Sequence, residues 1–85
     1  MNLENEFLQK SELIKKSNIN ISNEIKLNLY KYYKQAVIGD CNVKSPNFLE
    51  YEQKMKWTAW NHIKGTDKNK AMNEYISIVN EILIT

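Results

Sequence analysis

The sequence predicts an all-α protein, a small bundle of four helices, and three observations support this fold class. Apolar residues recur at helical spacing in four segments, and residues that favour helix ends separate these segments. Only 2 glycines and 1 proline interrupt the 85 residues, which is unusual for a loop-rich or all-β protein. A chain of this length holds one hydrophobic core, so we expect a single domain over residues 1–85.

The first helix is expected from about Leu3 to Ser17, and Asn2 is suited to be its N-cap. Its inward stripe consists of Leu3, Phe7, Ser11 and Ile14. A short linker over 18–22 follows, and Ser22 or Asn23 can cap the next helix.

The second helix is expected from Asn23 to Ile38, with Gly39 as the residue that ends it. Its polar stripe covers only about 60° of the helical wheel. This stripe consists of Glu24, Asn28, Lys31 and Gln35. The remaining arc is largely apolar or aromatic and is wider than the roughly 100° that one core contact needs. We therefore expect the helix to contact a core and a second partner.

The loop over residues 40–48 contains Pro46 and is long for a connection between helices, which permits the helices on either side to run parallel. The third helix is expected from Leu49 to Lys64, ending at Gly65. The fourth is expected from Thr66 or Asp67 to the end of the chain. The predicted apolar face of the third consists of Met55, Trp57, Ala59, Trp60 and Ile63. That of the fourth consists of Ala71, Met72, Tyr75, Ile76, Ile78, Val79, Ile82 and Leu83.

Composition excludes several kinds of protein. The single Cys41 cannot form an internal disulfide, and together with the single His62 it cannot build a Cys/His zinc site. No nucleophile stands beside a histidine and no paired acids are visible, so we expect no catalytic residues, metal or cofactor. The N-terminal residues lack the basic start and apolar run of a signal peptide, and no 18-residue apolar stretch occurs. We therefore expect a cytoplasmic protein.

Two lysines break the amphipathic pattern. On the wheel, Lys34 falls between Tyr30 and Leu27, and Lys56 falls beside Trp60, in both cases inside an apolar arc. Either side chain could cover apolar surface with its stem while its ammonium reaches water. Alternatively, the two could form a cationic rim above an apolar floor, which suits a ligand with an anionic head and an apolar body.

Tyrosines accompany these lysines. Tyr30 and Tyr33 lie within about 100° of Lys34, away from the core stripe that Tyr32 shares. A tyrosine there can stack on a base or donate to a phosphate. Tyr75 fits either a core or a site.

Two other functions remain open on the residues. One is a small nucleic-acid or nucleotide-binding bundle, although a net charge of +2 without an extended basic stripe argues against nucleic acid. The other is an interaction module that uses the wide apolar face of the second helix.

Three blocks of sequence are similar to those of the acyl-CoA-binding protein family. They are Tyr-Lys-Gln-Ala at 33–36, Lys-Trp-Thr-Ala-Trp at 56–60 and Ala-Met-Asn-Glu-Tyr at 71–75, and the resemblance covers nearly the whole chain. It implies an up-down-down-up bundle whose second and third helices run parallel. It also implies a non-enzymatic, monomeric carrier that binds long-chain fatty acyl-CoA, forms an intracellular pool of it, and transiently contacts membranes or acyl-CoA-using enzymes.

The resemblance also implies ligand-binding roles for individual residues. Tyr30, Lys34 and Lys56 match the residues that hold the 3′-phosphate of the CoA adenosine. Tyr33 matches a residue that stacks near adenine, and Tyr75 matches one that contacts the bound ligand.

Lys15 is a weaker match, to a position that reaches the ligand's head group. Other positions depart from the family pattern. Ile21 stands where proline is usual, which favours a more flexible linker. Ser11 stands in place of a common alanine and could make the acyl tunnel more polar. Glu52 replaces a common lysine beside Lys56, so it could weaken the local positive field and lower the affinity.

Overall fold

The computed structural model describes residues 2–84, which contain four α-helices and no strand. The helices are α1 (Leu3–Lys16), α2 (Asn23–Val37), α3 (Tyr51–His62) and α4 (Lys68–Ile84). All four predicted helices are present, and the first two end within one residue of their predicted bounds. The predicted end of the fourth helix, Thr85, lies outside the described residues. None of the helices within 2–84 has the length and apolar character needed to cross a membrane.

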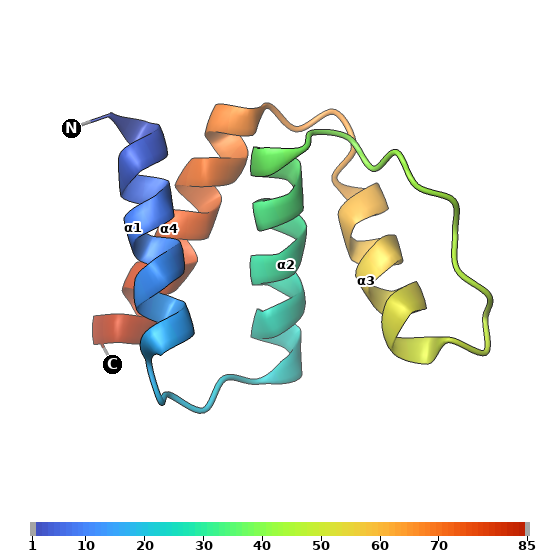
Figure 1. Cartoon of the computed structure of the whole chain (residues 1–85), viewed down its shortest axis with the longest axis horizontal. Coiled ribbons are helices and arrows are strands. Elements are labelled where there is room, and N and C mark those ends of the chain that lie inside the picture. The colour runs from blue at the N-terminus through green and yellow to red at the C-terminus, as the bar shows by residue number, and fades with distance from the viewer. Residues whose placement is uncertain (1, 85) are drawn as a thin grey trace.

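The helix α2 lies in the middle of the bundle. It packs against α4 on one side and against α3 on the other, while α1 packs against α4 (Figure 1). The helices α1 and α4 run in one direction, and α2 and α3 run in the opposite direction (Figure 1). The predicted up-down-down-up order with parallel second and third helices is therefore confirmed, and the long loop before α3 makes it possible.

Side-chain caps define the N-termini of three helices, at residues that the sequence suggested. The side chains of Asn2 and Ser22 each accept the backbone N–H three residues further on, at 2.8 and 3.2 Å. The Asp67 carboxylate accepts from the backbone N–H groups of Asn69 and Lys70 at 3.0 and 3.3 Å. These bonds satisfy donors that the first helical turn leaves without partners.

The start of α3 differs from the prediction, since the helix begins at Tyr51 rather than Leu49. A polar turn occupies the preceding residues. The Leu49 N–H donates to Asn47 Oδ1 at 2.9 Å, and the Glu50 N–H donates to the Asn47 carbonyl at 2.9 Å. The Asn side chain thus offers the backbone an alternative to a helical turn.

The end of α3 also comes early, at His62 rather than Lys64. The Ile63 and Lys64 N–H groups bond to carbonyls three residues back, at 3.2 and 3.3 Å, which tightens the last turn. Gly39 and Gly65 follow α2 and α3 with φ of 104° and 91°, a left-handed conformation that glycine adopts without steric cost. Gly39 therefore ends α2 as predicted, whereas Gly65 lies two residues beyond the C-cap of α3, Ile63.

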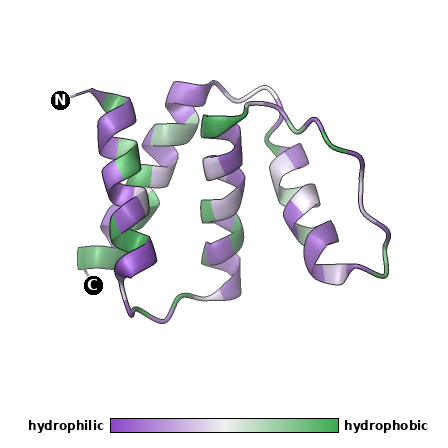
Figure 2. Ribbon diagram, viewed as in Figure 1, coloured by the Kyte–Doolittle hydropathy of each residue, from purple (hydrophilic) through white to green (hydrophobic). Residues whose placement is uncertain are grey.

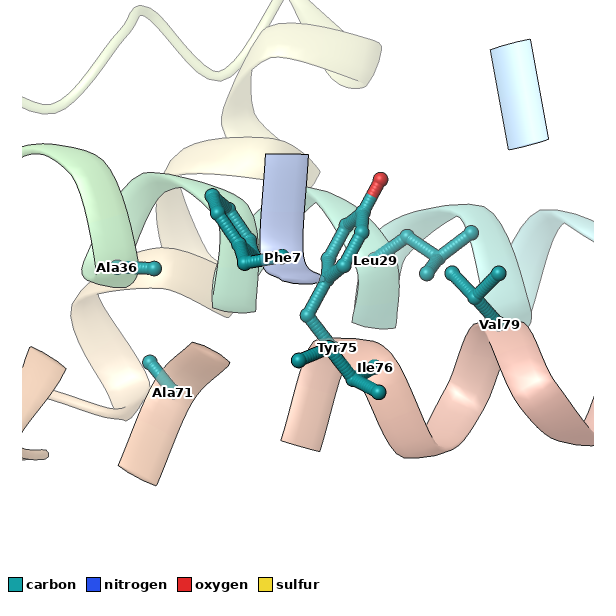
Figure 3. Packing of buried hydrophobic residues seen from close by; sticks show 7 residues of the cluster. All are labelled: Phe7, Leu29, Ala36, Ala71, Tyr75, Ile76 and Val79. Atoms are coloured by element: carbon teal, nitrogen blue, oxygen red, sulfur yellow. The ribbon is translucent and has the colours of Figure 1, made fainter. Parts of the chain in front are cut away.

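The hydrophobic core lies where α1, α2 and α4 meet. Its buried side chains are Phe7, Leu29, Ala36, Ala71, Tyr75, Ile76 and Val79 (Figure 3). Ile25 and Tyr32 of α2 are partly buried against this cluster, as their stripe predicts. The prediction for Leu83 is wrong, because that side chain lies past the packed part of α4 and is 37% exposed.

The prediction that Gln35 lies on a solvated polar stripe is wrong as well, because it is 1% exposed. Its Nε2 donates to Asp40 Oδ1 at 2.9 Å and to the Thr66 carbonyl at 2.8 Å, so its amide nitrogen is buried with partners. Asp40 Oδ1 also accepts the Gly65 N–H at 2.7 Å. These bonds tie the end of α2 to the connection between α3 and α4.

Tryptophans of α3 hold the long loop in place. The Trp60 indole N–H donates to the Gly39 carbonyl at 2.9 Å, and the Trp57 indole N–H donates to the Val43 carbonyl at 2.8 Å. Lys54 donates to the Ser45 hydroxyl. The loop therefore lies against α3 over its first half, and α3 is held at a fixed position beside α2.

Candidate ligand-binding site

The parallel packing of α2 and α3 brings together four residues that we call the lysine–aromatic cluster: Tyr30, Lys34, Lys56 and Trp60. The Lys34 ammonium lies 5.8 Å from the centre of the Tyr30 ring and 5.3 Å from that of Trp60. The Lys56 ammonium, from the other helix, lies 5.6 Å from the same Tyr30 ring. These distances lie within the range of cation–π attraction.

The lysine–aromatic cluster has an excess of positive charge. No carboxylate in residues 2–84 lies within ion-pairing distance of Lys34 or Lys56. Both lysines are partly buried, which agrees with the alternative that their stems cover apolar surface while their ammoniums reach water. Their ammoniums nonetheless lie at similar distances from the centre of one ring, 5.8 and 5.6 Å, with no acid within ion-pairing distance in residues 2–84. An anion bound near this ring could therefore interact with both cations.

Tyr30 can donate a hydrogen bond to such an anion. Burial raises the pKa of its hydroxyl above the ordinary value, and the nearby Cys41 raises it further. The hydroxyl is therefore protonated at neutral pH even though two ammoniums are close.

A pocket of about 610 Å³ opens beside the cluster, between the first halves of α2 and α3. Its volume lies within the range of small-molecule sites. The lining residues are Asn23, Lys26, Leu27, Tyr30, Tyr51, Glu52, Met55 and Lys56. Apolar side chains thus line a pocket whose charged residues include Lys56 of the cluster, an arrangement suited to an amphiphile with an anionic end.

An aromatic trio, Phe7, Tyr33 and Tyr75, lies on the adjacent face of α2, where α2 meets α1 and α4. The Tyr33 ring is stacked on Phe7 with the ring centres 5.6 Å apart, and it lies 6.0 Å from Tyr75. Phe7 and Tyr75 meet edge to face at 5.0 Å. The expectation that Tyr33 lies away from the core is wrong, because Phe7 of α1 reaches across and packs it against the buried cluster.

Tyr75 is both a core residue and a polar one. It is 4% exposed, and its hydroxyl points away from α4 (Figure 3). Burial raises its pKa, while a hydrogen bond with the buried Ser11 opposes the rise. Ser11 therefore has a polar partner inside the bundle, and it does not line the pocket between α2 and α3.

Lys15 is exposed, and its ammonium lies 6.0 Å from the centre of the Tyr33 ring. The six candidate residues thus fall into two groups on adjacent faces of α2, with Tyr30, Lys34 and Lys56 in the one next to α3 and the other three in the one next to α1 and α4. No ring contact or cation–π pair joins the two groups within residues 2–84. They are linked through the backbone, because Tyr33 and Lys34 are neighbours in the chain.

Some pocket residues were not identified from the sequence. Lys26 lines the pocket and stands one turn before Tyr30, so the helical spacing could have pointed to it. Tyr51 stands one turn before Met55 at the start of α3, and the misplaced start of that helix hid the relation. No group of three or more potential metal-ligating side chains occurs in the described range.

Comparison with known families agrees with this geometry. The family model described as acyl-CoA-binding protein matches residues 4–79, which include both groups of candidate residues. The chain belongs to the acyl-CoA-binding protein family. The resemblance seen in the sequence blocks is thereby confirmed, and proteins of this family are binding proteins rather than enzymes.

Curated relatives carry corresponding names. "Acyl-CoA-binding domain-containing protein 1" of Oryza sativa subsp. japonica is 40% identical over 83 residues, which cover 98% of this chain and 91% of that protein. "Acyl-CoA-binding domain-containing protein 6 homolog" of Dictyostelium discoideum is 57% identical over 63 residues, or 74% of this chain. The match spans only 22% of that longer relative.

Solved structures confirm the fold. A crystal structure of Oryza sativa acyl-CoA-binding protein 2 has a TM-score of 0.92 and 37% identity, over 98% of this chain and 92% of that chain. A crystal structure of ACBP from Moniliophthora perniciosa has a TM-score of 0.91 and 31% identity, over 99% and 82%.

Proposed function

We propose that this protein binds long-chain fatty acyl-CoA esters reversibly and carries them without transforming them. One observation carries the proposal: two lysine ammoniums face one tyrosine ring, with no carboxylate of residues 2–84 within ion-pairing distance, beside a pocket of about 610 Å³ with apolar lining. Acyl-CoA combines several phosphate charges with a long apolar chain. Its two ends correspond to the two parts of this site.

The head group would bind at the lysine–aromatic cluster. Lys34 and Lys56 supply compact charges to the 3′-phosphate, and the protonated Tyr30 hydroxyl donates a hydrogen bond. Charge-assisted hydrogen bonds are about twice as strong as neutral ones. A phosphate bound beside the Tyr30 ring would interact with both ammoniums at once.

The aromatic trio would form the other wall of the head-group site. We assign Tyr33 to stacking near the adenine, since its ring is only partly buried and can still present surface to a base. Lys15, above the same ring, would reach the phosphates of the head group. Tyr75 would contact the ligand through its hydroxyl end, because its ring is buried in the core.

The acyl chain would occupy the pocket between α2 and α3. Leu27 and Met55 are its aliphatic lining, and each buried CH₂ of the ligand contributes roughly 0.8 kcal/mol. Affinity should therefore increase with chain length until the pocket is filled. Withdrawal of the chain from water would also lower the concentration of free, detergent-like acyl-CoA.

The broader role follows from reversible binding. We propose that residues 1–85 act as one acyl-CoA-binding domain, as a monomer in the cytoplasm, that holds a pool of acyl-CoA and exchanges it with membranes and with enzymes that use it. Supporting this, the family model covers residues 4–79.

Calorimetry tests the proposal directly. Titration with palmitoyl-CoA should give tight binding with one site, free CoA should bind weakly, and palmitate should hardly bind. A series of shorter acyl-CoA esters should show affinity rising with length. Equal binding of palmitate and palmitoyl-CoA would refute the assignment of the lysines. A gel shift with oligonucleotides at matched concentration is the comparison. Stronger binding of oligonucleotides than of palmitoyl-CoA would support a nucleic-acid function instead.

A further inference from the structure

The corner at which the long loop meets α3 presents two apolar side chains to solvent. Phe48 is 79% exposed and Leu49 is 78% exposed, and we call this pair the apolar tip. The hydropathy colouring marks this corner as hydrophobic, at the end of the molecule where α2 begins (Figure 2). Neither side chain lines the pocket or belongs to the core, so neither packing nor ligand binding explains it.

The apolar tip is held in an ordered turn. The Leu49 N–H donates to Asn47 Oδ1, and the Asn47 N–H donates to Glu50 Oε2 at 3.3 Å. The Glu50 N–H returns to the Asn47 carbonyl, and the preceding half of the loop is bonded to α3. A flexible loop could fold its apolar residues back onto the protein, but this turn fixes them outward.

The pocket mouth lies beside the apolar tip. Tyr51, 63% exposed, is two residues from Leu49 and lines the pocket, as does Met55 one turn later. The other wall comes from the start of α2, which lies at the same end of the molecule (Figure 1). The tip therefore adjoins the pocket mouth in the chain, with only Glu50 between Leu49 and Tyr51.

The charges around this end favour an anionic surface. Lys26 and Lys56 line the pocket, and Lys44 and Lys54 stand on the loop and on α3. Fewer acids oppose them, and these are Glu24, Glu50 and Glu52. Phe and Leu side chains flanked by lysines are typical of segments that insert shallowly at a membrane surface, where lysine stems extend toward the headgroups.

We propose that the apolar tip docks the pocket mouth onto a phospholipid bilayer that contains anionic lipids. This inference rests on the proposed function, since it gives the acyl chain a route from the bilayer into the pocket without crossing water. A second copy of this chain is a poorer occupant, because stable interfaces bury roughly 800 Å² on each partner and two side chains supply far less. Docking through the two side chains of the apolar tip would be weak and reversible, as a carrier requires.

Vesicle flotation with the ligand-free full chain tests the proposal. The vesicles are phosphatidylcholine alone, or phosphatidylcholine mixed with an equal amount of phosphatidylserine. The test variant is Phe48→Ser with Leu49→Ser. The matched control is Leu8→Ser with Leu13→Ser, which removes two other apolar side chains, 48% and 50% exposed, from the outer face of α1.

We expect the test variant to lose roughly tenfold or more in partitioning to the mixed vesicles, while the control behaves as the parent. The single variant Phe48→Ser should show part of the same loss. Equal partitioning of the parent and the test variant would overturn the proposal, and so would a loss confined to the α1 control. Sedimentation that shows a dimer in the parent and a monomer in the test variant would overturn it in favour of self-association.

Solution titration with palmitoyl-CoA separates this proposal from the proposed function. The test variant should bind palmitoyl-CoA as the parent does, because the tip lies outside the pocket. Vesicle binding without palmitoyl-CoA binding would support the docking surface and refute the function. Palmitoyl-CoA binding without vesicle binding would refute the docking surface alone.

Discussion

Replacement of either lysine in the lysine–aromatic cluster by alanine should weaken ligand binding while leaving the fold intact. The structure gives the reason, because the ammoniums of Lys34 and Lys56 lie 5.8 and 5.6 Å from one tyrosine ring and have no carboxylate partner in the described chain. Their interactions within the protein are therefore limited to aromatic faces. Their strongest interaction would form only when a phosphate is present.

The size of the effect follows from these contacts. Loss of one hydrogen bond to a charged group costs about 1.5–3 kcal/mol, so each variant should lose roughly tenfold to a hundredfold in affinity for palmitoyl-CoA. In the folded protein Lys34→Ala removes two cation–π contacts and Lys56→Ala removes one, each worth about 0.5–1 kcal/mol at an exposed site. Each variant also removes a charge from a largely apolar arc, which offsets part of this loss. The melting temperature should therefore change little.

The assay combines calorimetric titration with thermal melts of the parent, Lys34→Ala and Lys56→Ala. The control is Lys31→Ala, since Lys31 lies on the same helix with its ammonium 5.2 Å from the centre of a different ring, Tyr32. That variant should bind palmitoyl-CoA as the parent does. An ester of dephospho-CoA, which lacks the 3′-phosphate, should abolish the difference between parent and variants. If both cluster variants bind palmitoyl-CoA with parental affinity, the phosphate site lies elsewhere and the reasoning fails.

Three further predictions concern single side chains. Tyr30→Phe should cost about 1–2 kcal/mol of acyl-CoA affinity through one lost hydrogen bond, whereas Tyr32→Phe should cost none; a lowered melting temperature for Tyr30→Phe with unchanged titration would contradict the assignment. Glu52→Gln should raise acyl-CoA affinity by on the order of 0.5 kcal/mol, because it removes the one carboxylate among the pocket-lining residues; unchanged affinity at low salt, where screening is weakest, would contradict this prediction. The pKa of the Asp40 carboxyl lies below its ordinary value of 3.8, because the carboxylate accepts hydrogen bonds from the Gly65 N–H and, with a smaller effect, from the Gln35 amide. The stabilising contribution of Asp40 is therefore complete above pH 3.8, and it is lost as the pH falls through the lower pKa of the folded state. The free energy of unfolding, measured with urea above and below pH 3.8, should fall less on acidification for Asp40→Asn than for the parent. The same pH dependence in parent and variant would refute the linkage.

The fold was predictable where hydrophobic spacing and capping residues agreed. In α1, α2 and α4 the apolar stripe and the cap both marked the same helix, and the structure confirms them. The third helix carried weaker signals, because it lies at the edge of the bundle and buries only Trp60 fully. Its predicted start at Leu49 placed an exposed apolar residue in the first helical turn. The turn formed by Asn47 depends on a local side-chain hydrogen bond, which periodicity does not register.

The candidate site was predictable in its charges and less so in its packing. Lysines inside an apolar arc break the helical pattern, so Lys34 and Lys56 could be found from spacing. That both ammoniums would face Tyr30 depends on how α2 and α3 pack, and a single helical wheel contains no such information. Gln35 illustrates the same limit. Its burial depends on Asp40, which lies beyond the end of α2, and on Thr66, which is 31 residues further along the chain.

The two sides of α2 differ in how binding and stability are connected. The lysine–aromatic cluster lies outside the core, so its cations can be altered with little effect on folding. The aromatic trio is part of the core: Phe7 and Tyr75 are 2% and 4% exposed, and Tyr33 packs against both. A domain of this size buries only about 60–65% of its unfolded surface, which leaves few side chains for a core that is separate from the site. The same rings therefore stabilise the bundle and, under the proposed function, shape the surface offered to the ligand. The part of the site next to the adenine would then be held in place by the core before the ligand binds, while specificity for the phosphate could be adjusted on the side that faces α3.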